Sequence, residues 1–259
     1  MAEPGLVTTR EEGLCVVRLN RPERLNAIGG DMLDRFTSEL LPAAQDPGVR
    51  CILLIGAGRA FCAGGDVGTL DNGRARESRR DAMRAPHVWV KALRQSDAIV
   101  VSAVNGAAAG GGFGIALLAD IVLASSAAFF KAGFADLGLS PDYGLGFTLP
   151  RAIGELRAAE ILFSDRRVKA DEALSLGMVS RVYPEQSFEA DAFAFARKLA
   201  QASAAARLTK RLLRLSEREA FAAYLEAEAE AQADAFDSAD FKEGAAAFLE
   251  KRAPRFRGE

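Results

Sequence analysis

The sequence has 259 residues, 49% of them apolar and 26% charged, which is long and apolar enough for a sizeable core in a soluble globular protein. With 33 basic and 35 acidic side chains, its formal net charge of −2 excludes a general basic surface for nucleic acid or anionic membranes. Three cysteines without CxxC spacing predict neither a disulfide framework nor a metal site, and they fit a cytoplasmic protein. No secretory leader pattern begins the sequence and no apolar run reaches about 18 residues, so we expect neither secretion nor a membrane span.

Along the chain, short β-rich runs alternate with helical or loop stretches. Strands are predicted at 14–19, 49–55, 98–104 and 120–125, and helices at 30–44, 85–95 and 110–119. From about residue 188 the pattern changes to long segments rich in Ala, Glu, Leu and Phe with helical spacing. We therefore expect an α/β core with mostly parallel strands over residues 1–187 and a helical C-terminal region over 188–259.

Two glycine-rich loops follow predicted strands, "GAGRAFCAGGDVG" (56–68) and "VNGAAAGGGFGIALLAD" (104–120). The first loop has neither the spacing of a dinucleotide loop nor that of a nucleotide-triphosphate loop. By itself, the first loop is also compatible with a tight crossing from strand to loop. Glycines leave backbone N–H groups uncovered, and in the second loop Gly110, Gly111 and Gly112 stand at a predicted helix start, where negative charge is favoured. Together the loops predict a two-donor oxyanion hole able to hold an enolate.

Six segments in order resemble the crotonase family, the enoyl-CoA hydratase/isomerase superfamily. They are "RPERLNAI" (21–28), "GRAFCAGGD" (58–66), "VNGAAAGGG" (104–112), "LGLSPDYGLGFTLPRAIG" (137–154), "ADEALSLGMVSRV" (170–182) and "EGAAAFLEKRAPRF" (243–256). The resemblance implies a spiral of ββα units followed by a helical trimerisation region. It also implies a coenzyme A thioester as substrate, no tightly bound cofactor, and assembly as a homotrimer or homohexamer.

The resemblance also implies roles for individual residues. The backbone N–H groups of Gly65 and Gly111 match the oxyanion hole for the thioester oxygen. Residues that match the coenzyme A site are Arg24, Ala27, Ala63, Gly64, Gly65, Asp66, Val67 and Gly111, together with Phe248 and Lys251, which in some members reach the nucleotide from a neighbouring subunit.

The number of available carboxylates separates the reactions of this family. Hydratases that resemble this chain use two glutamates to hold a water and supply a proton. At the matching positions this chain has Gly114 and Phe134, which cannot transfer protons. Asp136, two residues after Phe134, is acidic and would lie on the same side of an extended segment. We therefore expect no two-glutamate hydratase mechanism.

Asp142, in "GLSPDYGLG" (138–146), is the leading candidate for the catalytic acid/base. The Pro-Asp-x-Gly pattern alone predicts a turn that the aspartate caps. The apolar neighbours Leu139 and Phe147 favour a raised pKa instead, and the resemblance places the working aspartate of several enoyl-CoA isomerases and of chlorobenzoyl-CoA dehalogenases here. One carboxylate suffices to shift a double bond, so an isomerase is the leading prediction.

His87 is the single histidine, and its spacing from Asp142 matches the dehalogenase pair, in which a histidine activates water against an aspartyl ester. A dehalogenase tryptophan is, however, replaced here by Phe134, and a lone histidine on an amphipathic helix is also compatible with packing. The arginine-rich run 74–84 predicts either a solvated face or attraction for coenzyme A phosphates. The sequence is also compatible with an unconventional hydratase and with a non-catalytic protein that binds coenzyme A esters.

Overall fold

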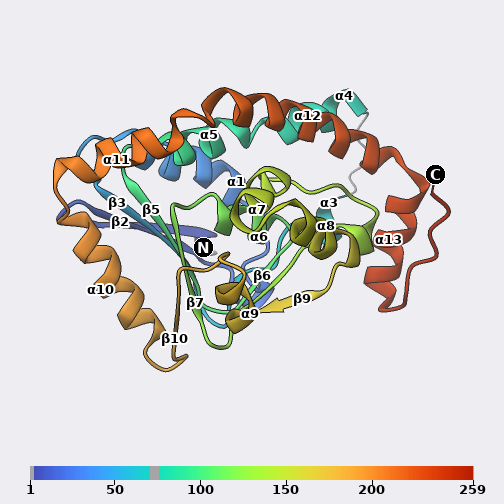
Figure 1. Cartoon of the computed structure of the whole chain (residues 1–259). Helices are drawn as coiled ribbons and strands as arrows, with labels where there is room; N and C mark the ends of the chain where they lie inside the picture. Colours follow the sequence, from blue (N-terminus) through green and yellow to red (C-terminus); the bar gives the residue numbers. More distant parts are fainter. Residues whose placement is uncertain (1–2, 71–75, 259) are drawn as a thin grey trace.

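The computed structural model describes residues 3–70 and 76–258, and its strands form two sheets (Figure 1). The six-stranded sheet contains, in spatial order, β1 (Leu6–Glu11), β2 (Leu14–Leu19), β3 (Cys51–Gly56), β5 (Ile99–Val104), β7 (Ile121–Ser125) and β10 (Arg181–Tyr183). All of its pairings are parallel except β1 with β2. The four-stranded sheet contains β4 (Ala60–Cys62), β6 (Ala107–Ala109), β8 (Phe129–Lys131) and β9 (Arg167–Lys169), with only β8 and β9 antiparallel.

Helices occupy most of the remaining chain. In order they are the 3-10 turn η1 (Pro22–Arg24), α1 (Met32–Arg35), the π turn η2 (Phe36–Leu40), α2 (Leu41–Gln45), α3 (Val67–Leu70), α4 (Arg76–Arg84), α5 (His87–Gln95), α6 (Gly111–Leu117), the 3-10 turn η3 (Ala135–Leu137), α7 (Leu145–Ile153), α8 (Glu155–Ser164), α9 (Ala170–Ser175), α10 (Phe188–Ala200), α11 (Ala204–Leu215), α12 (Arg218–Asp237) and α13 (Ala239–Glu250). No helix among the described residues is long and apolar enough to cross a membrane.

The expected α/β class is confirmed, and the four predicted strands are present within one or two residues of their predicted ends. The strand β3 is buried along its whole length because helices cover both faces of the six-stranded sheet. The face covered by α10 holds a smaller cluster that includes Leu53, Val101 and Ala196. The other face holds the larger core, with Phe36, Trp89 and Phe113. The domain division after residue 187 stays a prediction.

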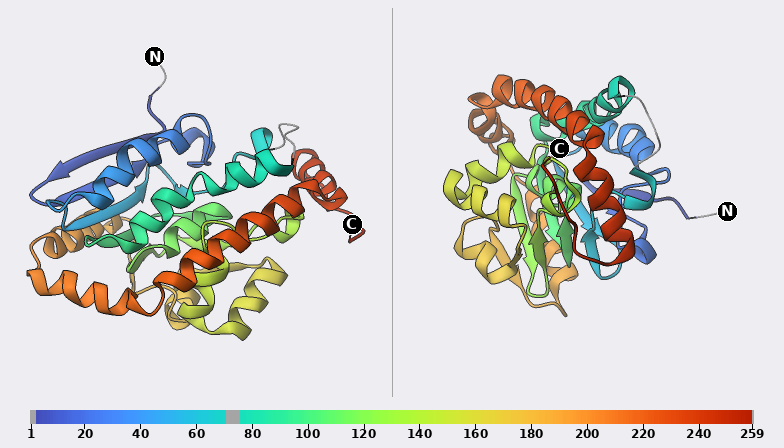
Figure 2. Two further views of the ribbon diagram at one scale, coloured as in Figure 1. Left: turned by 90° about the horizontal axis from the view of Figure 1, so that it is seen from above. Right: turned by 90° about the vertical axis from the view of Figure 1, so that its right-hand side faces the viewer.

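The helix predicted at 30–44 is interrupted rather than uniform, because a π turn separates α1 from α2. The helices α12 and α4 lie side by side across one side of the molecule, and Figure 2 shows α12 following the line of α4 and α5. The side chains of Arg79 and Arg84 on α4 pair with Asp237 and Glu226 on α12, at 2.7 and 2.9 Å. This contact brings the C-terminal helices against the middle of the chain.

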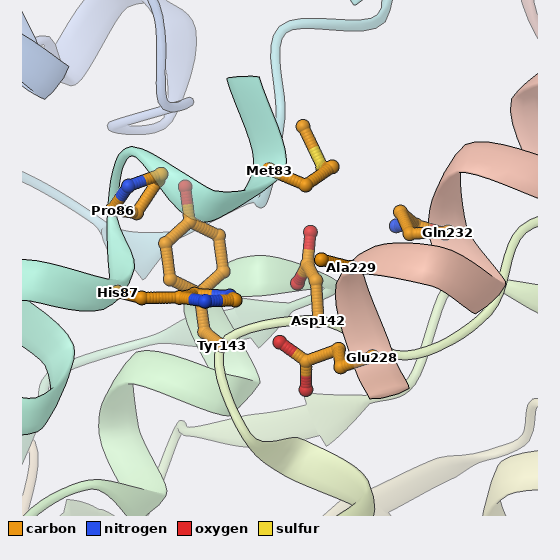
Figure 3. A pocket seen from close by; sticks show the side chains of 8 residues that line it. All are labelled: Met83, Pro86, His87, Asp142, Tyr143, Glu228, Ala229 and Gln232. Atoms are coloured by element: carbon orange, nitrogen blue, oxygen red, sulfur yellow. The ribbon is translucent and has the colours of Figure 1, made fainter. Parts of the chain in front are cut away.

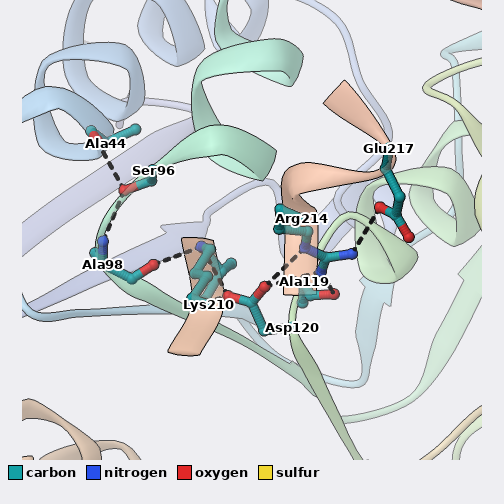
Figure 4. A network of polar contacts seen from close by, with 9 residues as sticks. Ala44, Ser96, Ala98, Ala119, Asp120, Lys210, Arg214 and Glu217 are labelled. Carbon is teal, nitrogen blue, oxygen red and sulfur yellow. Dashed lines mark hydrogen bonds and ion pairs between the residues drawn. The ribbon is translucent and has the colours of Figure 1, made fainter. Parts of the chain in front are cut away.

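A buried polar network joins α11 to the six-stranded sheet (Figure 4). Asp120, just before β7, pairs with Lys210 at 2.7 Å and with Arg214 at 2.8 Å. The Lys210 ammonium also donates to the carbonyl of Ala98 at 2.6 Å, and Arg214 pairs with Glu217 at 3.2 Å. A buried ammonium with a carboxylate and a carbonyl as partners is well compensated. The network therefore fixes which face of α11 turns toward the sheet.

Candidate active site

The part of the first glycine loop that follows β4 runs alongside the segment that follows η1. The N–H of Ile28 donates to the carbonyl of Gly64 at 2.7 Å, and the N–H of Asp66 donates to the carbonyl of Ile28 at 3.0 Å. This ladder brings together the predicted coenzyme A residues of 24–27 and 63–67. Gly64 has a φ of +93°, a conformation that glycine adopts without strain.

The second glycine loop meets the first one. A Cβ built on Gly64 would lie 2.9 Å from the carbonyl oxygen of Ala109 and 3.4 Å from the backbone nitrogen of Gly111. Gly110, with a φ of +51°, directly follows β6, and α6 begins at the next residue, Gly111. Among the described residues, neither the Gly65 nor the Gly111 N–H has a hydrogen-bond partner. The structure thus brings the two predicted oxyanion donors to adjoining loops.

Asp142 stands in the turn before α7 and points toward the second loop. Tyr143 and Gly144 have φ values of +49° and +73°, and the N–H of Leu145 donates to the Asp142 carbonyl at 3.1 Å. A Cβ on Gly111 would lie 3.2 Å from Oδ1 of Asp142. A turn is present, but it spans residues 142–145 with left-handed backbone at both central positions, and Oδ1 of Asp142 does not cap it. This turn aims the carboxyl group at the start of α6.

The environment of Asp142 favours proton transfer. Its Oδ1 atom is buried and lacks a hydrogen-bond partner in the described part of the chain. Burial raises the pKa of Asp142 to about 7, and hydrogen bonds from its own backbone and from Gln232 oppose that rise. A carboxyl group with a pKa near 7 is present in both protonation states at neutral pH, as a general acid/base requires.

A cavity of about 30 Å³ adjoins Asp142, which is room for about one water molecule (Figure 3). It is lined by Met83, Pro86, His87, Asp142, Tyr143, Glu228, Ala229 and Gln232. His87 and Asp142, paired in the sequence prediction, therefore do face one space. Burial, with the positive charge of Lys91 next, lowers the pKa of His87 to about 4, so its imidazole is neutral at pH 7. Its Nδ1 lies 3.9 Å from Oε1 of Glu226.

The structure shows why position 114 cannot hold the glutamate that hydratases carry there. A Cβ on Gly114 would lie 2.7 Å from the carbonyl oxygen of Asp142 and 2.9 Å from Cβ of Tyr143. The turn carrying Asp142 thus occupies the space that a side chain at 114 would need. Phe134 is buried at the start of η3.

Asp136, which would lie on the side of Phe134 only if its segment were extended, does not line the cavity. Its carboxylate is 57% exposed and pairs with Lys131 at 2.6 Å. The segment is not extended there, because Asp136 lies within the 3-10 turn η3. Residues on a turn do not alternate sides as strand residues do. A separation of two residues therefore does not place Asp136 on the same side as Phe134.

Sequence reasoning missed the cavity residues that come from α12, among them Glu228 and Gln232, because the C-terminal helices were interpreted as a trimerisation region. Burial, with the negative charge of Asp142 next, raises the pKa of Glu228 to about 9. The sequence did contain a signal for them, because both residues fall on the same buried stripe of α12 as Phe221, Leu225 and Phe236. Polar side chains on an apolar stripe require buried partners.

The remaining predicted binding residues differ in exposure. Arg24 is exposed on η1, and Ala27 is buried against the first loop. Phe248 is 59% exposed near the end of α13, and Lys251 caps that helix, which packs against η3 and α12. Their contact with a nucleotide stays a prediction.

The arginine run 74–84 is partly described. Residues 74 and 75 lie outside the described residues. The side chains of Arg79, Arg80 and Arg84 pair with acidic residues of α12. This part of the run therefore anchors α4 to α12.

Comparisons with known proteins cover nearly the whole chain. A family model described as enoyl-CoA hydratase/isomerase matches residues 9–259. The chain is 36% identical over 253 residues to 1,2-epoxyphenylacetyl-CoA isomerase of Escherichia coli, covering 96% of this chain and 97% of that protein. It is 38% identical over 249 residues to a probable enoyl-CoA hydratase of Rhodobacter capsulatus, covering 95% of each. A solved enoyl-CoA hydratase from Mycobacterium avium subsp. paratuberculosis matches with a TM-score of 0.89 and 33% identity, covering 98% of this chain and 99% of that one.

Proposed function

Because the chain belongs to the enoyl-CoA hydratase/isomerase family, the crotonase superfamily, we propose that it shifts a double bond in an enoyl-CoA thioester, with Asp142 as the acid/base. The Asp142 carboxylate removes a proton from one carbon of the acyl chain. The electron pair moves onto the thioester oxygen, and the resulting enolate accepts hydrogen bonds from the N–H groups of Gly65 and Gly111. The same carboxyl group then returns the proton two carbons away, and no proton is gained or lost overall.

One observation carries this proposal: the Oδ1 atom of Asp142 is buried, has no partner among the described residues, and lies beside Gly111. A buried carboxylate oxygen without a donor is costly, so it is best explained as a site that the substrate completes. The crowding at Gly114 supports the same conclusion, since it leaves no space for the first hydratase glutamate.

For substrate binding, we assign the coenzyme A moiety to the ladder formed by 24–28 and 63–67, with Arg24 at its exposed edge. We also propose a cytoplasmic homotrimer or homohexamer. Apolar side chains exposed on α11 support self-association; they are Leu208, Leu212, Leu213 and Leu215. Such a row on a soluble protein is typical of a surface that another chain covers. A neighbouring subunit would then supply Phe248 and Lys251 to the nucleotide.

Two other reactions have a specific observation in their favour. Hydration is supported by Glu228, a second carboxyl group facing the cavity beside Asp142, and by the hydratase names of several relatives. Hydrolytic dehalogenation of an aryl-CoA is supported by the neutral His87, which faces the same cavity and could activate water.

The experiment that separates these reactions is incubation with 2-enoyl-, 3-enoyl- and halobenzoyl-CoA esters in D₂O, followed by mass spectrometry. Bond migration with deuterium uptake is the result expected here. A mass gain of one water would support hydration, and halide release would support dehalogenation. Tight binding without any conversion would contradict all three and indicate a non-catalytic protein.

A further inference from the structure

The helix α12 holds the turn of Asp142 on both sides. Gln232 accepts hydrogen bonds at Oε1 from the backbone N–H and the hydroxyl of Ser140, each at 3.0 Å. One helical turn earlier, Glu228 accepts a hydrogen bond at Oε2 from the N–H of Gly144, at 2.8 Å. Ser140 and Gly144 stand two residues before and two residues after Asp142. The position of the Asp142 carboxyl group therefore depends on the position of α12.

The two bonds from Ser140 also fix the orientation of the Gln232 amide. Both are donors, so the atom that receives them must be the oxygen, and the –NH₂ group must occupy the other end. Figure 3 shows that end turned toward Asp142. A hydrogen bond from Gln232 lowers the pKa of Asp142. Gln232 is 1% exposed, so water does not compete for this contact.

We propose that Gln232 is a positioning residue for Asp142: its amide N–H holds one carboxylate oxygen and leaves Oδ1 free, beside Gly111, to exchange a proton with the substrate. This inference rests on the proposed function, in that Asp142 is taken as the acid/base. The amide has two effects. It fixes the rotation of the carboxyl group, and it stabilises the anionic form against the burial that raises its pKa. Ser140, in turn, fixes the orientation of the Gln232 amide through its two hydrogen bonds.

The surroundings of Asp142 make this effect measurable. The titratable groups that face it are Glu228 and Tyr224 from α12, His87 from α5, Cys62 from β4 and Tyr143 from its own turn. Burial raises the pKa of Glu228 to about 9 and that of Cys62 to about 12, and raises the pKa values of both tyrosines. His87 has lost its proton above about pH 4. Between pH 5 and 8, Asp142 is therefore the group of this set that changes charge.

The test compares Gln232→Met with Ser140→Ala and with a surface control, Gln186→Met. Methionine keeps the length of glutamine but has no donor, whereas Ser140→Ala keeps the Gln232 amide and one of its two anchors. Gln186 is exposed in the turn before α10. The carboxyl pKa of Asp142 is measured by ¹³C NMR and assigned with Asp142→Asn. The pH dependence of kcat/KM for double-bond migration is measured in parallel.

Gln232→Met is expected to raise the Asp142 pKa and the acidic limb of kcat/KM by about one pH unit, which is about a tenfold loss of activity at pH 6. Ser140→Ala is expected to shift both by less than half as much, and Gln186→Met by nothing. An unchanged Asp142 pKa in Gln232→Met would overturn the proposal, because a purely structural role changes stability and not this pKa. An equal shift in Ser140→Ala would also overturn it, since the turn and not the amide would then be responsible.

The two measurements keep this inference separate from the proposed function. If the wild-type protein moves no double bond, the proposed function fails, while the NMR titration still decides the role of Gln232. If activity is present and the NMR shift is absent, the positioning role fails alone. Thermal unfolding of each variant identifies any loss of folded protein, and Ser140→Ala provides the comparison for lost packing.

Discussion

Substituting Gly114 by alanine tests whether the Asp142 turn really occupies the place of the missing glutamate. The new Cβ would lie 2.7 Å from the Asp142 carbonyl oxygen and 2.9 Å from Cβ of Tyr143. Carbon atoms pack favourably at about 3.5–4.0 Å, so the turn must retreat by roughly half an ångström or more. Overpacking of this kind costs about 1–3 kcal/mol. A displacement of about 1 Å at a catalytic group can cost about 10²-fold in rate, so we expect about a tenfold loss of kcat here.

The assay pairs urea unfolding with kcat on a 3-enoyl-CoA. Gly68→Ala is the control for stability, because Gly68 lies within α3 and a Cβ there would lie 3.7 Å from the nearest atom of the described residues. That control is expected to be neutral or to stabilise by about 0.4–1 kcal/mol. Wild-type stability and kcat in Gly114→Ala would refute the reasoning, since they would show that the turn does not press against α6. By the same geometry, Gly114→Glu is not expected to create a two-glutamate hydratase.

Three further predictions concern the protonation of Glu228, the role of His87 and the exposed apolar face of α11. Glu228 keeps its proton in the folded chain up to about pH 9 but loses it near pH 4.5 when unfolded, so its contribution to stability falls as the pH rises through this range. Glu228→Gln should therefore lose less stability than wild type between pH 5 and 9 in thermal melts; an identical pH dependence would contradict the raised pKa. His87→Gln should reduce double-bond migration by less than about tenfold, because Asp142 alone transfers the proton, whereas a loss above about 10²-fold in steady-state assays would make His87 a catalytic group. Leu212→Glu, on the exposed face of α11, should shift the sedimentation profile toward smaller species, and an unchanged profile would place the subunit contact elsewhere.

The sequence was sufficient to predict the parts of the site that depend on local rules. The strands showed as apolar runs, and the loops at Gly65 and Gly111 showed as glycine clusters directly after strands. Pro-Asp-x-Gly predicted a turn at Asp142 but not its left-handed geometry, and the apolar neighbours of Asp142 indicated the direction of the pKa shift that burial produces. These features are each set by residues close together in the chain.

The parts that were missed depend on contacts between distant segments. Gln232 reaches Ser140 across 92 residues, and Glu228 reaches Gly144 across 84, so no local pattern pairs them. The orientation of Asp136 was also open in the sequence, and it is decided by a 3-10 turn, rather than an extended segment, after Phe134. The crowding at Gly114 was also not predictable, because it depends on how closely the Asp142 turn approaches α6.

The central claim is that Asp142 moves the proton, and Asp142→Asn tests it most directly. The amide has nearly the same shape but cannot accept a proton, so general acid/base catalysis worth about 10²–10⁴-fold should be lost. The measurement is deuterium incorporation and bond migration in a 3-enoyl-CoA in D₂O, with binding of the same ester followed by calorimetry. The account predicts that binding remains within a few-fold of wild type while both exchange and migration fall by at least about 10²-fold. Exchange and migration at wild-type rates in Asp142→Asn would contradict it.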